Sequence, residues 1–205
     1  QETRAWLDLK SQRVLKIPLR LAAGLGRLGD LLRLGPISAT SVVQLEQGIF
    51  ADPTALSQRI PTRPRGFRSF LVASLAGTQD LWQARLYLLK PLIRLSLALM
   101  WIASAAIGLL LPAGQFLPAG SAMSAPLALF VARGGGVADA LLALALLRNC
   151  GQKATAAAQL LLVGAYTIGL SVISADPWLD PFGGLLKNLP VLALILVHMA
   201  LIDER

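Results

Sequence analysis

The stretch Leu186-Lys-Asn-Leu-Pro-Val-Leu-Ala-Leu-Ile-Leu-Val-His-Met-Ala-Leu-Ile202 decides the fold of this chain. Its side chains are almost all aliphatic, apart from Lys187, Asn188 and His198. A helix rises about 1.5 Å per residue, so a segment of this length comes close to crossing the roughly 30 Å hydrocarbon core of a bilayer. The stretch therefore predicts a membrane-spanning helix, entered from a loop rich in turn-forming residues.

Three more apolar segments precede this one. We expect spans at about residues 91–111, 127–147, 154–174 and 186–202, each near the length that a bilayer requires. A soluble helix bundle is the competing interpretation, but four such segments in succession disfavour it. Small residues in the first and third spans would let the helix backbones approach closely. The predicted fold class is an all-α membrane protein, a four-transmembrane-helix bundle preceded by a small, mainly α-helical basic segment.

Composition and charge support this division. Hydrophobic residues make up 55% of the 205 residues and charged residues only 15%, against about 25% charged in a typical soluble domain. The net charge of +8 lies entirely in residues 1–94, which hold fourteen Lys and Arg against six Asp and Glu. A basic half beside membrane spans favours contact with an anionic leaflet of the lipid bilayer. Nucleic acid is not an expected partner, because no RNA-binding pattern accompanies the charge.

The distribution of Lys and Arg also predicts the orientation. Arg85, Lys90 and Arg94 precede the first span, and Arg148 and Lys153 join the second span to the third. The connection between the first two spans carries no charge from residue 112 to 126. Because cytoplasmic loops carry the excess of positive charge, we expect both termini and the loop between the second and third spans to be cytoplasmic.

Residues 1–84 form the basic, mainly helical segment, and residues 85–205 form the membrane domain. Alternation over Arg13–Pro18 predicts a short strand. Leucines then recur on one face of an expected helix, at positions 21, 25, 28 and 32. This helix would pack on a neighbouring domain or, alternatively, lie on the membrane surface. Ser38 or Ser41 is expected to cap a short helix ending at Gln47, and Thr78 to start another.

Three polar side chains inside the spans are candidates for chemistry. Asp139 lies roughly 12 Å along its helix from the cytoplasmic end, and Tyr166 and His198 lie about 18 and 6 Å from the same side. A carboxylate at this depth costs about 2.5–3.5 kcal/mol on insertion scales, so Asp139 should face the bundle interior, near one or both of the others. It would be protonated or bonded to a hydroxyl such as Thr167 and hold the helices in register, or it would serve a proton relay or a quinone head group.

The sequence has no pattern typical of a disulfide, metal, haem or nucleotide-binding site. Cys150 is the only cysteine, which excludes a disulfide or a dithiol within the chain. A lone histidine does not support a metal or haem site. No dinucleotide-binding, phosphate-binding or nucleophile motif is present, so we expect no catalytic residue and no cofactor-binding residue in this chain. The run Gly134-Gly-Gly136 is expected to permit a bend in the second span.

The last loop and the spans resemble the DoxX-like membrane protein family. Asp180-Pro-Phe-Gly-Gly-Leu-Leu-Lys-Asn-Leu-Pro190 is similar to the family's His-Pro-Phe-Gly-Pro…Lys-Asn-(Leu/Ile)-Pro signature, with Asp180 in place of the usual histidine and Gly184 in place of a frequent proline. Ala138-Asp-Ala-Leu-Leu142, Gln159 and Tyr166-Thr167 resemble its second and third spans. The resemblance extends over residues 85–205 and implies membrane-associated redox chemistry, as in thiosulfate:quinone oxidoreductase subunits, with a quinone as candidate cofactor. The candidate outer-loop site is Asp180, Phe182, Lys187 and Asn188.

Residues 1–84 resemble the C-terminal end of atypical short-chain dehydrogenase/reductase proteins of the epimerase-like kind that are fused to a DoxX-like domain. Leu28-Gly-Asp-Leu-Leu32 and Trp82-Gln-Ala-Arg-Leu-Tyr87 carry this resemblance. It implies a dinucleotide-binding domain upstream of this chain, and NAD(P) would bind there. The expected function is a non-catalytic module that anchors this reductase domain to the bacterial inner membrane. A quinone- or lipid-interacting redox subunit is the first alternative, and a small transporter or structural envelope protein is the second.

Overall fold

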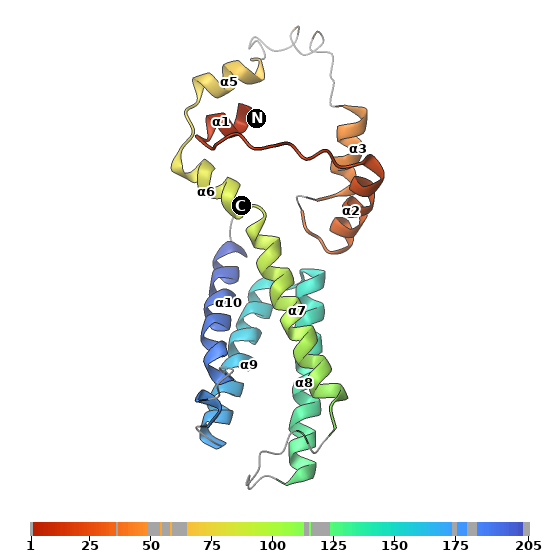
Figure 1. The fold of residues 1–205 in the computed structure, drawn as a ribbon, viewed down its shortest axis with the longest axis vertical. Helices are drawn as coiled ribbons and strands as arrows, with labels where there is room; N and C mark the ends of the chain where they lie inside the picture. Colours follow the sequence, from red (N-terminus) through yellow and green to blue (C-terminus); the bar gives the residue numbers. More distant parts are fainter. Residues whose placement is uncertain are drawn as a thin grey trace. The chain divides into compact units, whose positions relative to one another are not determined.

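A computed structural model describes residues 2–35, 37–48, 54, 58, 65–112, 115, 124–173, 176–179 and 184–202. Every regular element in these ranges is a helix, and none of the described residues forms a strand (Figure 1). The expected all-α class is therefore confirmed. The chain divides into two compact units, Gln1–Leu89 and Lys90–Arg205, which are described separately as unit 1 and unit 2.

Four long helices build unit 2, and each is long and apolar enough to cross a membrane. They are α7 (Leu89–Leu110), α8 (Ala125–Arg148), α9 (Gln152–Ile173) and α10 (Asn188–Ile202). A 3₁₀ turn, η3 (Leu185–Lys187), leads into α10, and another, η2 (Asp176–Trp178), follows α9. The ends of these four helices lie within two residues of the span ends predicted from the sequence, because hydrophobic length largely determines where a spanning helix begins and ends.

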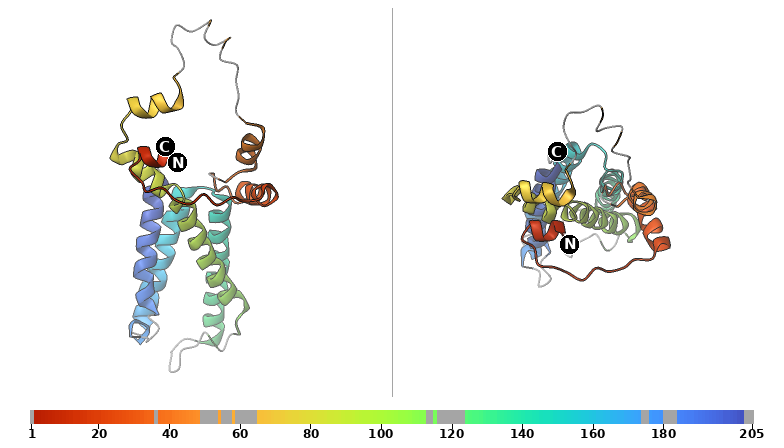
Figure 2. Two further views of the ribbon diagram at one scale, coloured as in Figure 1. Left: turned by 45° about the horizontal axis from the view of Figure 1, so that its top comes forward. Right: turned by 90° about the horizontal axis from the view of Figure 1, so that it is seen from above.

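The helices of unit 2 pack with α9 beside both α8 and α10 (Figures 1 and 2). Helix α7 crosses α8 where two glycines meet: a Cβ on Gly108 would lie 2.9 Å from Cα of Gly136. The guanidinium of Arg133 on α8 secures the end of α7, donating hydrogen bonds of 2.8 Å to the Gly108 carbonyl and 2.9 Å to the Leu111 carbonyl. The last carbonyl groups of a helix have no backbone N–H to bond within that helix. Arg133 supplies donors to two of them, and the carbonyl oxygens in turn stabilise its positive charge.

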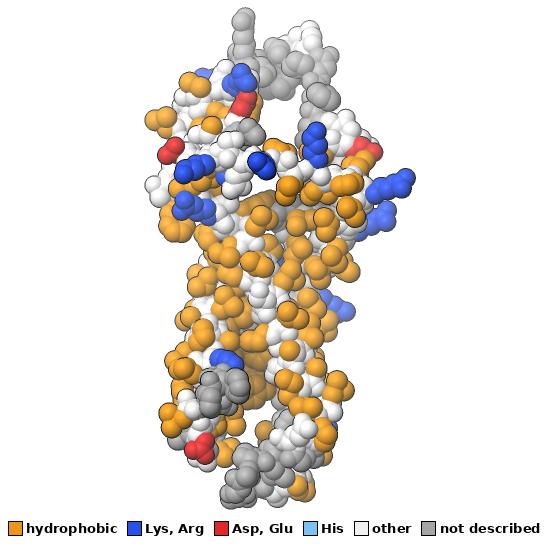
Figure 3. Space-filling model, in the orientation of Figure 1, with side chains coloured by type: hydrophobic (Ala, Val, Ile, Leu, Met, Phe, Trp, Pro, Cys, Tyr) orange, Lys and Arg blue, Asp and Glu red, His pale blue; other side chains and the backbone are white. Residues whose placement is uncertain are grey.

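The core of unit 2 lies toward one end of the bundle. Buried residues extend from Ile93 to Ala105 on α7, but on α9 burial stops at Val163 and on α10 it begins only at Ile195. The halves of α9 and α10 nearest their connection are therefore loosely packed. The outer surface of unit 2 is covered with apolar side chains (Figure 3), as expected of helices that face lipid.

The described residues of unit 1 include five short helices: α1 (Glu2–Trp6), α2 (Leu19–Leu31), α3 (Ala39–Gln47), α5 (Phe67–Ala73) and α6 (Thr78–Leu86). Helices α2 and α3 pack against each other, and α1 packs on α5. Between Glu2 and Arg68 lies an ion pair of 2.5 Å, and the indole N–H of Trp6 donates to the Ser74 carbonyl at 2.5 Å. These contacts hold the α1–α5 pair together.

Close approach of backbones defines the α2–α3 hairpin. Gly26 and Gly29 are buried, and a Cβ on Gly26 would lie 2.9 Å from Cα of Ala39. Ser38 caps α3, because its hydroxyl oxygen accepts from the backbone N–H of Ser41 at 3.0 Å. The expected cap and the expected end of this helix at Gln47 are confirmed. The face of α2 that meets α3 therefore carries glycines, because a larger side chain there would collide with the backbone of residues 37–39.

The strand predicted over residues 13–18 is wrong. Residues 9–18 adopt no regular structure, and residues 11–21 are all exposed. A strand requires a neighbouring strand to receive its backbone hydrogen bonds, and the described residues of unit 1 provide none. The alternation of basic and apolar side chains in this stretch therefore belongs to an extended, solvent-facing segment.

Candidate intramembrane site

Asp139 on α8 is the centre of a buried polar group in unit 2. Its side chain is only 3% exposed. The Ser104 hydroxyl on α7 donates to its Oδ2 at 2.5 Å, and the Tyr166 hydroxyl on α9 donates to its Oδ1 at 3.1 Å. These three residues, the Asp139 cluster, connect three of the four spans. Such bonding offsets the cost of placing a carboxyl group among apolar helices.

Glycine makes room for this cluster. A Cβ at Gly135 would lie 2.7 Å from the Tyr166 hydroxyl oxygen, so a larger residue there would push this hydroxyl away from its present position. Helix α8 continues uninterrupted through residues 134–136, and two of the three glycines are sites of close contact. A bend was expected from this run, and the role in packing was missed. The signal was the spacing, because Gly135 precedes Asp139 by four residues and so shares its helix face.

A second set of hydrogen bonds fastens the start of α10 to α9. The Asn188 amide donates to the Thr167 hydroxyl oxygen at 2.8 Å, and that hydroxyl donates to the Val163 carbonyl at 2.7 Å. Thr167 follows Tyr166 directly, so Asn188 lies near the Asp139 cluster. The sequence had suggested Thr167 as a hydroxyl partner of Asp139. In the structure Ser104 and Tyr166 provide the hydroxyl groups instead.

The other outer-loop candidates contribute less to the described structure. Lys187, in η3, is exposed. Asp180 and Phe182 lie outside the described residues. Just before them, the indole N–H of Trp178 donates to the Ser171 hydroxyl oxygen at 2.8 Å, which holds η2 against the end of α9.

A third pair lies deeper in the core. Trp101 and Gln159 are 2% and 0% exposed, and the indole N–H donates to the amide oxygen at 2.9 Å. The Gln159 amide donates in turn to the Thr155 carbonyl at 3.3 Å. In the sequence Gln159 was distinguished only through the family resemblance. An apolar environment makes this pairing necessary, since an indole N–H without an acceptor would be costly there.

His198 on α10 is buried, at 4% exposure, but in a different part of the bundle. It lies within electrostatic reach of Arg94 and Lys90, and it lines a narrow crevice with Leu146 and Thr155. Leu146 is seven residues beyond Asp139, or roughly 10 Å further along α8. The structure thus joins Asp139 with Tyr166 and places His198 beside other residues.

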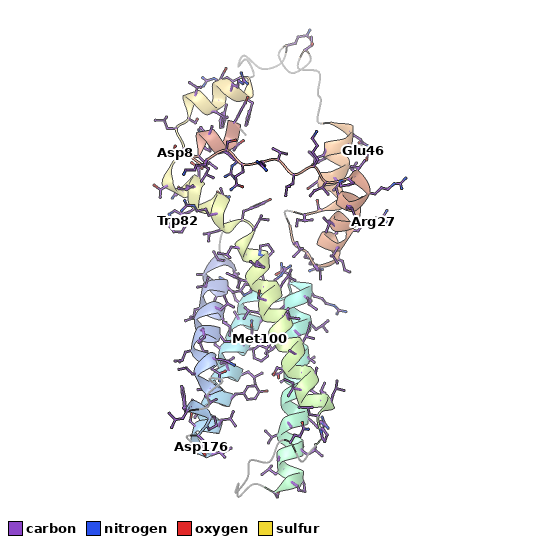
Figure 4. The ribbon with its side chains drawn as sticks, in the orientation of Figure 1. Asp8, Arg27, Glu46, Trp82, Met100 and Asp176 are labelled. Atoms are coloured by element: carbon purple, nitrogen blue, oxygen red, sulfur yellow. The ribbon has the colours of Figure 1, made fainter. Side chains whose placement is uncertain are left out.

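The Asp139 cluster borders the loosely packed half of unit 2. Tyr166 is half-buried, whereas Ile168 and Val172, two and six residues beyond it on α9, are 67% and 82% exposed. Figure 3 shows this end of unit 2 hollowed between the α9–α10 pair and α8, and Met100 in Figure 4 marks the middle of α7 above it. No group of three or more His, Cys, Asp or Glu residues suited to a metal occurs among the described residues. The arrangement can exchange hydrogen bonds with the polar head of an apolar ligand.

Comparison with known proteins gives a family for this bundle. The model of the DoxX-like family matches residues 98–196. A search of curated proteins and a search of solved structures found no match to the chain. The matched residues include Ser104, Asp139, Tyr166 and Asn188, and they stop two residues before His198. Residues 98–196, within the membrane-spanning part of this protein, match the DoxX-like family.

Proposed function

We propose that this chain is a membrane module that anchors an NAD(P)-dependent reductase or epimerase-like domain, encoded upstream of Gln1, to the bacterial inner membrane. One observation carries the proposal: a unit of four spanning helices follows directly on a separate compact unit that is small, basic and helical. A module of this kind would hold the upstream domain at the membrane, with unit 1 as the connection between that domain and the spans. The resemblance of residues 1–84 to the end of a short-chain dehydrogenase/reductase supports the identity of the anchored domain.

The reading frame upstream of Gln1 gives the first test. A dinucleotide-binding sequence is expected there, and its absence would contradict the proposal. The second test expresses the whole frame with and without residues 90–205 and measures NADPH binding in washed membranes and in the soluble fraction. Deleting the spans should move the binding to the soluble fraction. If NADPH binding stayed in the membranes without the spans, another part of the protein would be the anchor.

A second function is favoured by the Asp139 cluster. A buried carboxyl held by two hydroxyls, beside loosely packed apolar helix ends, is suited to the polar head of a quinone or another lipophilic ligand. Ligand pockets are typically apolar with a few placed polar groups. In this reading Ser104, Tyr166 and Asp139 hold the head group by hydrogen bonds, and the exposed ends of α9 and α10 contact the tail.

Titration of the purified protein in detergent with a short-chain quinone analogue distinguishes the two functions. Asp139→Asn should weaken binding at least about tenfold, which corresponds to roughly 1.4 kcal/mol, because an amide presents one acceptor oxygen where the carboxylate presents two. Gln152→Ala is the control, since Gln152 bonds Asn149 at the opposite end of α9 and lies outside the cluster. Equal affinities in wild type and Asp139→Asn would make the cluster purely structural.

A further inference from the structure

The segment from Arg13 to Leu28 in unit 1 carries an apolar surface with no described covering. Val14, Leu15 and Ile17 in the extended part are 73%, 86% and 59% exposed. Leu21, Leu25 and Leu28 on α2 are 62%, 48% and 48% exposed, although they lie on one helix face. The buried face of α2 is instead the glycine face that meets α3. The leucines are therefore free for a partner outside the described residues.

The charge around this surface indicates what the partner is. Residues 10–33 contain six Lys and Arg but a single acidic residue, Asp30. The Asp30 carboxylate already accepts from the Ala39 backbone N–H at 3.0 Å. The cations are distributed through the segment. By the helical repeat of α2, Arg20 and Arg27 lie to one side of the leucine face, and Figure 4 labels Arg27 on this helix. The list of cations is Lys10, Arg13, Lys16, Arg20, Arg27 and Arg33.

We propose that residues 13–32 lie on the membrane surface and bind anionic phospholipid through the leucine face of α2 and the surrounding Lys and Arg. An amphipathic helix with cations beside its apolar face is the form that interfacial segments take. The extended stretch before it adds alternating basic and apolar side chains, which the sequence analysis had assigned to a strand. An anionic leaflet matches this excess of cations over its whole length.

Attachment to the spans makes such binding effective even where the segment alone would bind weakly. Unit 1 is joined through the chain to α7, so its distance from the bilayer is limited by a covalent connection. A tethered contact becomes intramolecular, with an effective concentration that depends on the length of the connection. The inference does not depend on the anchored reductase domain or on the ligand of the Asp139 cluster.

The test places a fluorophore on each side of α2 in the full-length chain. Leu25→Cys and Ala23→Cys are made separately in a Cys150→Ser background, labelled with an environment-sensitive dye and reconstituted in vesicles. Residues 23 and 25 are about 200° apart around the helix, so they report opposite faces. Quenching is measured with doxyl-labelled lipid and with aqueous iodide, in phosphatidylcholine vesicles and in vesicles with about one-third phosphatidylglycerol.

In the anionic vesicles we expect the probe at residue 25 to be quenched by the lipid at least about threefold more than the probe at residue 23, and to be protected from iodide. Arg13→Gln with Lys16→Gln and Arg20→Gln should reduce this difference by half or more, since surface attraction scales with the number of cations. Equal access of iodide to both probes would overturn the proposal. Protection from iodide without quenching by lipid would overturn it as well, because a protein would then cover the face.

Discussion

Asp139 shows how a membrane protein accommodates a single acidic residue at depth. Two hydroxyl donors on two other helices satisfy its oxygens, so the carboxyl group links the spans and does not remain an isolated charge. Polar contacts of this kind are modest in membranes, averaging about 0.6 kcal/mol and reaching about 1.7 kcal/mol. Their value lies in fixing which helix faces meet, and Asp139 determines this for α7, α8 and α9.

A double-mutant cycle measures this link. Asp139→Ala and Tyr166→Phe, alone and together, should give an interaction energy of about 0.6–1.7 kcal/mol in the free energy of unfolding in mixed micelles. The physical reason is that either change removes the same hydrogen bond. The control cycle pairs Asp139→Ala with Ser171→Ala, which should add within about 0.5 kcal/mol. Additive energies for the Asp139 and Tyr166 changes would show that this hydrogen bond does not contribute to stability.

At this scale the sequence predicted depth but not partners. Asp139 was expected to face the interior, because a charge at that depth is costly wherever it points toward lipid. Tyr166 was expected near Asp139 from its depth, but Ser104, 35 residues away, was not named, because it reaches Asp139 only through the packing of helices far apart in the sequence. His198 was grouped with it by depth alone, but it is buried in another part of the bundle, beside Leu146 and Thr155.

Helices α7 and α8 illustrate how small residues determine contact between elements. At Gly108 a Cβ would lie 2.9 Å from the Ala132 carbonyl oxygen and from Cα of Gly136, both backbone atoms that cannot move aside. At Gly134, on the same helix as Gly136, a Cβ would meet nothing within 4 Å. Gly134 and Gly136 thus look alike in the sequence, but only Gly136 lies in the close contact with α7.

We therefore expect Gly108→Ala to lower the free energy of unfolding by about 1–3 kcal/mol, because the added carbon forces the two helices apart. Gly134→Ala should leave it unchanged or raise it by up to about 1 kcal/mol, since alanine is the better helix former. Both are measured by denaturant unfolding in the same micelles. Equal destabilisation by the two substitutions would contradict the close crossing of α7 and α8.

The α1–α5 pair of unit 1 should respond to acid. Hydrogen bonds from Arg68, at 2.8 and 2.5 Å, together with its positive charge hold the pKa of Glu2 below its ordinary value. Because the pKa is lower when the helices are paired, the stabilisation is present above the ordinary Glu pKa and is lost as pH falls through the lowered value. Both side chains are exposed, so the effect on stability is small.

Carboxyl NMR of protein labelled at glutamate measures this shift, since the chain contains only three glutamates. Arg68→Gln should raise the pKa of Glu2 toward its ordinary value. A Glu2 titration that is the same with and without Arg68 would mean that α1 and α5 are not paired in solution. Arg4→Gln is the control, because Arg4 bonds the Lys10 carbonyl and not Glu2.

Over the whole molecule, the positions of the spans were the most predictable property and their mutual arrangement the least. A bilayer requires every backbone polar group of a span to be bonded within its own helix, so apolar length alone located α7, α8, α9 and α10. Their packing depends on pairs such as Trp101 and Gln159, 58 residues apart, which no local pattern reveals. The strand prediction failed because residues 13–18 have the alternating pattern of a strand but no neighbouring strand among the described residues.

Topology is the property of the whole molecule that a single native residue can report. Cys150, the only cysteine, is exposed and lies in the short connection between α8 and α9, between Arg148 and Lys153. The excess of positive charge there and before α7 predicts that this connection faces the cytoplasm. Leu179, 83% exposed after η2, lies in the connection that should face outward.

Spheroplasts that express the protein should therefore leave Cys150 unlabelled by a membrane-impermeant maleimide until the membrane is permeabilised. In a Cys150→Ser background, Leu179→Cys should be labelled without permeabilisation. The reason is that one span, α9, separates the connection that holds residue 150 from the connection that holds residue 179, so the two face opposite sides of the membrane. Labelling is read as a mass shift on a gel. Labelling of Cys150 in intact spheroplasts, with Leu179→Cys protected, would invert the orientation and place the basic unit 1 outside. Labelling of both without permeabilisation would mean that α9 does not cross the membrane.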